Sequence, residues 1–150
     1  MNASADSQES MALASLWGGI VLANAGLGAV HGLVAPLGGR CIIPHGIGCA
    51  CLLVETLKAN LAALRERAPQ NPALERYEKV ARRLSFKSPE ALVDGLADLR
   101  RLLGVGTLSS YGVTRDDVMP IVKSARGGSM KYNPIELTDG ELEGIVRASL

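Results

Sequence analysis

The hydrophobic positions of this chain repeat with helical spacing along most of its length. One clear stripe has the i, i+4, i+7, i+11 spacing of a single helix face and consists of Leu92, Leu96, Leu99 and Leu103. Similar stripes predict helices over about 7–27, 31–37, 44–66, 73–84 and 89–103, with shorter ones after 114 and after 138. No segment of useful length alternates with the period of two that a strand requires. We therefore expect an all-α, multi-helix bundle that forms a single domain over residues 1–150.

Residues that start helices agree with these segments. Pro44 and Pro89 suit the first turn of a helix, where a missing N–H removes no intrahelical hydrogen bond. Ser88 precedes Pro89 as a candidate N-cap, and Thr138 with Glu141 has the spacing of a capping box. The boundaries of the predicted helices are therefore supported by local chemistry as well as by periodicity.

Most of the first helical segment lies in a stretch of the chain that carries no charge. Between Glu9 and Arg40 lie 30 residues without Lys, Arg, Asp or Glu, a length that could cross a bilayer. Seven glycines, together with Asn24, His31 and Pro36, weaken that interpretation, and no basic residue precedes the segment to set its orientation. We expect instead a central core helix that is apolar on every side because other helices cover every side.

Composition narrows the possible functions. The formal net charge is +1, from 16 basic and 15 acidic residues, and aromatic residues make up 3% of the chain. This offers neither a basic field nor a base-stacking platform, so no nucleic-acid partner is expected. The three cysteines, at positions 41, 49 and 51, are a poor disulfide framework. They predict a reduced, cytoplasmic protein whose thiols pack as small hydrophobic groups.

Two histidines are the candidate chemical groups. His31 and His45 are fourteen residues apart and flank the glycine pair at 38–39, a turn that can bring their imidazoles together. Imidazole binds zinc, iron, nickel and copper, but a catalytic metal needs at least three protein ligands, so two histidines form an incomplete set. A structural role in the core is the alternative. The spacing of Cys41, His45 and Cys49 matches no established zinc-finger pattern.

The run from Asn24 to Leu53, NAGLGAVHGLVAPLGGRCIIPHGIGCACLL, resembles the signature of the iron-containing (group III) alcohol dehydrogenases. The shared elements are the AGLG turn, V-H-G, P-L-G, and P-H-G fourteen residues after the first histidine. The segments Lys58–Asn60 and Asn133–Thr138, the latter reading NP-x-x-L-T, resemble the family as well. The resemblance covers essentially the whole chain and implies the C-terminal helical domain of that family.

Members of that family interconvert alcohols and aldehydes with NAD(P) and one divalent metal, commonly iron or zinc. They hold the metal with an aspartate, a histidine four residues after it, and the two signature histidines. By resemblance those two are His31 and His45. The aspartate–histidine pair and the NAD(P)-binding domain have no counterpart in this chain. Many members also carry a histidine near the nicotinamide where this chain has Ala35.

The resemblance therefore implies the metal-binding half of an NAD(P)-linked alcohol dehydrogenase or aldehyde reductase. Such a half would be inactive alone and would need a separately encoded nucleotide-binding domain as its partner. The sequence singles out no catalytic or NAD(P)-contacting residue. A second function class stays open: a non-catalytic helical interaction module, derived from the same family, that forms homo-oligomers through exposed apolar surface.

Overall fold

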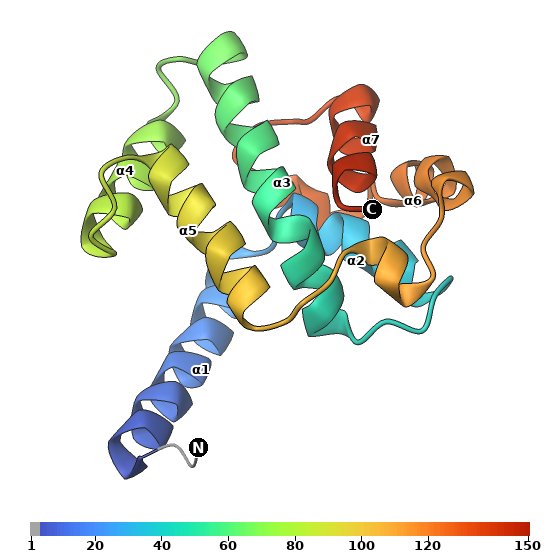
Figure 1. The fold of residues 1–150 in the computed structure, drawn as a ribbon. Helices are drawn as coiled ribbons and strands as arrows, with labels where there is room; N and C mark the ends of the chain where they lie inside the picture. Colours follow the sequence, from blue (N-terminus) through green and yellow to red (C-terminus); the bar gives the residue numbers. More distant parts are fainter. Residues whose placement is uncertain (1–3) are drawn as a thin grey trace.

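The structure, a computed structural model, describes residues 4–150 as an assembly of α-helices and short 3-10 turns, with no β-strand among them (Figure 1). The α-helices are α1 (Ala5–Ala25), α2 (Ala29–Gly38), α3 (His45–Arg67), α4 (Pro72–Arg83), α5 (Pro89–Leu102), α6 (Val118–Ser124) and α7 (Asp139–Ala148). The 3-10 turns are η1 (Leu108–Tyr111), η2 (Arg115–Asp117) and η3 (Gly128–Tyr132). The predicted all-α fold is confirmed.

Side-chain caps explain where several helices begin. Ser88 Oγ accepts the Ala91 N–H at 3.2 Å ahead of α5. Before α7, Thr138 Oγ1 accepts the Glu141 N–H at 3.2 Å, and Glu141 Oε2 accepts the Thr138 N–H at 2.6 Å, which completes the predicted capping box. Such a cap contributes about 1 kcal/mol, because it satisfies backbone N–H groups that have no partner inside the helix.

The main core lies where α2, α3, α6 and α7 meet. Its fully buried side chains include Leu33 on α2, Leu52 on α3, Ile121 on α6 and Leu142 on α7. A smaller cluster, formed by Val54, Leu61 and Val93, joins α3 to α5. α3 is thus the central helix, since it contacts α2, α4, α5 and α7.

The first helix contradicts the prediction that it is a covered core helix, because none of the residues of α1 is buried. Its large apolar side chains are between 44% and 69% exposed: Met11, Leu13, Leu16, Trp17, Ile20, Val21 and Leu22. Figure 1 shows α1 projecting away from the other helices. After Asp6 and Glu9, α1 carries no charge, yet no described part of the chain covers it.

α3 alone meets the length and composition criteria of a membrane span among the described helices. Half of its most apolar stretch is buried inside the bundle. α1 and α2 meet the same criteria only as a pair, and a bend of 100° separates them. Packing against the other helices therefore accounts for the apolar character of α3, whereas contacts within the chain do not account for that of α1.

A pair of amide side chains joins two segments that lie far apart in the sequence. Asn133 Nδ2 donates to Asn60 Oδ1 at 2.7 Å and to the Ile135 carbonyl at 2.8 Å. Asn133 Oδ1 accepts the Ala29 N–H at 3.0 Å, at the start of α2. These bonds hold the N-terminus of α2 close to α3, and α2 is the helix that carries His31.

Candidate metal centre

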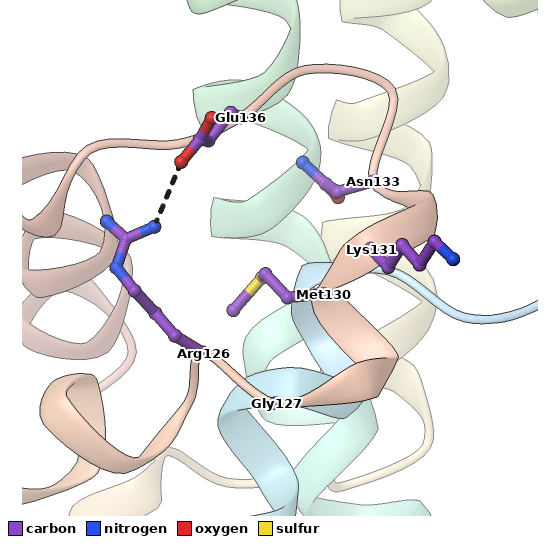
Figure 2. Close-up of a pocket in the computed structure, with 6 residues that line it drawn as sticks. All are labelled: Arg126, Gly127, Met130, Lys131, Asn133 and Glu136. Atoms are coloured by element: carbon purple, nitrogen blue, oxygen red, sulfur yellow. Dashed lines mark ion pairs between the residues drawn. The ribbon is translucent and has the colours of Figure 1, made fainter.

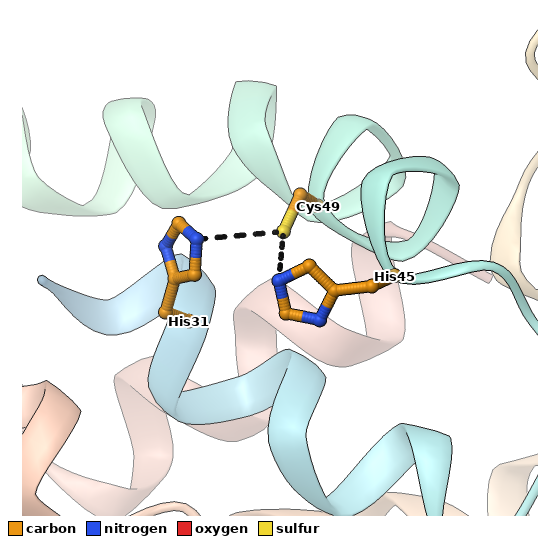
Figure 3. Close-up of side chains that lie close together, drawn as sticks. All are labelled: His31, His45 and Cys49. Atoms are coloured by element: carbon orange, nitrogen blue, oxygen red, sulfur yellow. Dashed lines mark hydrogen bonds between the residues drawn. The ribbon is translucent and has the colours of Figure 1, made fainter. Parts of the chain in front are cut away.

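His31, His45 and Cys49 lie together where α2 and the start of α3 face each other (Figure 3). His31 lies in the first turn of α2, and His45 is the first residue of α3, with Cys49 one turn later. The imidazole centroids of the two histidines are 5.4 Å apart. The histidines are thus close in space, as the glycine pair between them suggested, while their role as metal ligands stays a prediction.

The turn between the helices and their close packing produce this arrangement. The N–H groups of Arg40 and Cys41 both donate to the Leu37 carbonyl, at 3.0 and 2.9 Å, which reverses the chain after α2. Gly48 allows the helices to approach, since a Cβ there would lie 2.6 Å from Val34 Cγ2. The histidine-bearing side of α2 is therefore held against the first turn of α3.

Cys49, to which the sequence assigned a packing role, lies between the two imidazoles. Its Sγ is 3.9 Å from His31 Nε2 and 3.6 Å from His45 Nε2. The i, i+4 spacing of His45 and Cys49 was the available signal, because it places both side chains on one helix face. The spacing along the sequence groups His45 and Cys49 with Cys41, whereas the structure groups them with His31. Within residues 4–150, these three side chains are the one group placed to share a metal ion, with ligand atoms within 4.8 Å of one another.

The surroundings of His31 favour its neutral form. Burial lowers the pKa of His31, and the charge that His45 can carry lowers it further. A neutral imidazole can ligate a metal, whereas a protonated one cannot. Burial also raises the pKa of the Cys49 thiol, so this thiol keeps its proton at neutral pH unless a metal displaces it.

The other two cysteines behave as the sequence predicted. All three are free thiols. Cys51 is fully buried in the core, and its Sγ donates to the Gly106 carbonyl at 3.3 Å. Cys41 is half-buried and packs against the same core. Only Cys49 combines packing with contact to the histidines.

A pocket between η3 and the segment before α7 offers a weaker site (Figure 2). It has a volume of about 330 Å³ and is lined by Arg126, Gly127, Met130, Lys131, Asn133 and Glu136. The guanidinium of Arg126 is paired with Glu136, at 3.6 Å, and with Asp139. Figure 2 shows Lys131 extending away from Arg126. Because two carboxylates already neutralise Arg126, this pocket is a poor receptor for an anion.

Comparison with known proteins points to one family. The sequence model described as "Fe-containing alcohol dehydrogenase family, C-terminal" matches residues 1–150. Lactaldehyde reductase from Escherichia coli (strain K12) is 31% identical over 155 residues, covering 94% of this chain and 36% of that protein. 1,3-propanediol dehydrogenase from Klebsiella pneumoniae is 30% identical over 142 residues, covering 93% and 36%. The chain thus spans little more than a third of the length of these relatives.

Solved structures share the helical arrangement. The crystal structure of a 1,3-propanediol oxidoreductase superimposes with a TM-score of 0.84 at 28% identity, covering 97% of this chain and 38% of that one. An alcohol dehydrogenase from Oenococcus oeni gives a TM-score of 0.76 at 25% identity, covering 88% and 35%. The bundle that brings His31 and His45 together is therefore a shared fold.

Proposed function

The chain belongs to the iron-containing alcohol dehydrogenase family, as its C-terminal domain, and we propose that it is the metal-binding helical half of an NAD(P)-linked alcohol dehydrogenase or aldehyde reductase. The approach of His31 and His45 from two different helices, to 5.4 Å between ring centroids, carries this proposal. The chain is inactive alone and works with a separately encoded nucleotide-binding domain.

The donor set of the centre fits a divalent metal such as iron or zinc. The two imidazoles have ligand nitrogens within 4.8 Å of each other, and imidazole is a ligand that first-row divalent metals accept. A bound metal would supply Lewis-acid polarisation of an alcohol or aldehyde oxygen. His31 and His45 would hold the metal through neutral imidazoles. NAD(P) would bind to the partner domain and would supply the hydride chemistry.

No proton relay is available one turn beyond His31. The residue there is Ala35, which is exposed on α2 and has no titratable side chain. The family histidine that the resemblance places at this position is therefore missing. This helix position therefore supplies no proton donor or acceptor.

The proposal includes a soluble, cytoplasmic protein without a nucleic-acid or membrane partner. A net charge of +1 gives no long-range attraction to nucleic acid or to an anionic membrane surface. Three free thiols suit a reducing compartment.

Metal retention by the purified chain tests the function. After loading and desalting, we expect the chain to retain Zn²⁺ or Ni²⁺ better than Fe²⁺ by elemental analysis, as the general affinity order predicts. His31→Ala and His45→Ala should each weaken binding by ~100-fold or more, since even residues behind the ligands typically cost 10–100-fold. The same preparation should bind no NADH in calorimetry. Full metal retention by both folded variants, or stoichiometric NADH binding, would contradict the proposal.

The exposed apolar surface of α1 supports a second candidate function, that of a helical interaction module that forms homo-oligomers. Seven large apolar side chains are exposed on this one helix, and extended apolar surface of this kind promotes association. In the enzyme proposal the partner domain covers this helix, whereas in the module proposal a second copy of the chain covers it. The two candidates therefore differ in what the isolated chain binds through α1.

The module proposal predicts concentration-dependent self-association that depends on Trp17. This side chain is 58% exposed near the middle of α1. Trp17→Glu should weaken association by about tenfold or more in sedimentation equilibrium, because aromatic side chains dominate interface energies. Leu102→Glu is the control, since Leu102 is 83% exposed on α5 and should leave association unchanged. A strictly monomeric wild-type chain would exclude the module and leave α1 to a different partner.

A further inference from the structure

We infer that Cys49 is a third protein ligand of this centre, so that the chain by itself forms a His₂Cys site selective for thiophilic divalent metals such as zinc and cobalt. The inference rests on the proposed function, in which His31 and His45 are metal ligands. It adds a residue that the sequence reasoning assigned to packing alone. It also replaces an incomplete two-ligand site by a three-ligand site formed entirely by α2 and α3.

The distances around Cys49 fit tetrahedral zinc. Zinc–nitrogen bonds of ~2.05 Å and a zinc–sulfur bond of ~2.3 Å, at the tetrahedral angle, place the nitrogen and sulfur ~3.6 Å apart. Cys49 Sγ lies 3.6 Å from His45 Nε2 and 3.9 Å from His31 Nε2. Two edges of the coordination polyhedron are thus close to their ideal lengths. Figure 3 shows the sulfur between the two rings, with a nitrogen of each ring directed toward it.

The remaining edge, between the ligand nitrogens of His31 and His45, needs only a small rearrangement to reach its ideal length. The ligand nitrogens of the two histidines lie within 4.8 Å of each other, against ~3.4 Å for two imidazoles on tetrahedral zinc. His31 and Cys49 are half-buried on packed helices, whereas His45 is exposed at the first position of α3. The exposed imidazole therefore supplies the movement, by side-chain rotation, while the other two ligands stay in place.

The donor set decides which metals bind. Cys49 adds a soft sulfur ligand, and no carboxylate among the described residues belongs to the cluster. Thiolate and imidazole together suit zinc, whereas iron(II) sites commonly add a carboxylate to two histidines. On binding, the sulfur–hydrogen bond is replaced by a sulfur–metal bond, and the proton goes to water. Three protein ligands leave a fourth position open, as in catalytic zinc sites.

Cobalt spectroscopy and zinc affinity test the inference on the whole 150-residue chain. Co²⁺-loaded wild-type chain should show near-ultraviolet sulfur-to-cobalt charge-transfer absorption, which Cys49→Ser should abolish. Zn²⁺ affinity should fall by ~10-fold or more in Cys49→Ser, at least the cost of losing an outer-shell residue. Cys41→Ser is the matched control, because Cys41 is an equally half-buried free thiol outside the cluster. It should keep both the absorption and the affinity.

The outcomes separate this inference from the proposed function. If both histidine variants lose the metal while Cys49→Ser keeps its affinity, the inference is wrong and the proposed function stands. If Cys49→Ser loses the metal and the histidine variants do not, both are wrong.

Alkylation of the wild-type chain gives a readout that needs no variant to fold. Zn²⁺ should protect Cys49 from iodoacetamide in peptide mapping and should leave the labelling of Cys41 unchanged. Equal labelling of Cys49 with and without Zn²⁺ would overturn the inference.

Discussion

Leu33→Ala should lower the free energy of unfolding by about 3–5 kcal/mol. Leu33 is fully buried on α2, in the core cluster that also contains side chains of α3, α6 and α7. Truncation removes apolar contacts and leaves a cavity, because helices packed on three sides cannot collapse fully into the space. A domain is stable by only about 5–15 kcal/mol in total, so this single change removes a large part of the stability. Urea unfolding followed by circular dichroism measures the loss.

Leu102→Ala is the control for that experiment. Leu102 ends α5 and is 83% exposed, so its truncation creates no cavity and should change stability by less than about 0.5 kcal/mol. A loss below about 1 kcal/mol for Leu33→Ala would mean that α2 does not pack into the core as described.

Asn133→Ala should cost about 2–4 kcal/mol, the second large effect. The variant removes the partner of the Ala29 N–H, of Asn60 Oδ1 and of the Ile135 carbonyl. Asn60 Nδ2 keeps its hydrogen bond to the Tyr77 hydroxyl at 3.5 Å. Asn60 is only 3% exposed, so water does not readily replace the lost hydrogen bond. A buried polar group left unsatisfied costs about 1–3 kcal/mol, and more than one is affected here. The same denaturation experiment gives the value.

Asn24→Ala is a matched asparagine control. Asn24 is exposed on α1, and its Nδ2 donates at 2.7 Å to the Ile20 carbonyl within the same helix. Its removal should change stability by less than about 0.5 kcal/mol. Equal effects of the two substitutions would show that the Asn60–Asn133 contact contributes nothing to stability.

Local sequence chemistry determined the helices themselves. The predicted segments over 7–27, 31–37, 44–66, 73–84 and 89–103 differ from the observed helices by no more than two residues at either end. Caps such as Ser88 and the Thr138–Glu141 box act within one turn, so neighbouring residues suffice to place them. The signature from Asn24 to Leu53 also sufficed to indicate the family, which the match over residues 1–150 confirms.

Contacts between helices were decided only by the tertiary structure. Cys49 meets His31 across 18 residues of sequence, and Asn60 meets Asn133 across 73. Such pairs depend on how the helices cross and turn, which the periodicity of a single helix does not encode. The same reason explains α1. Its sequence after Glu9 has no charge and provides many apolar side chains, but whether they are covered depends on neighbours, and none of the described residues buries them.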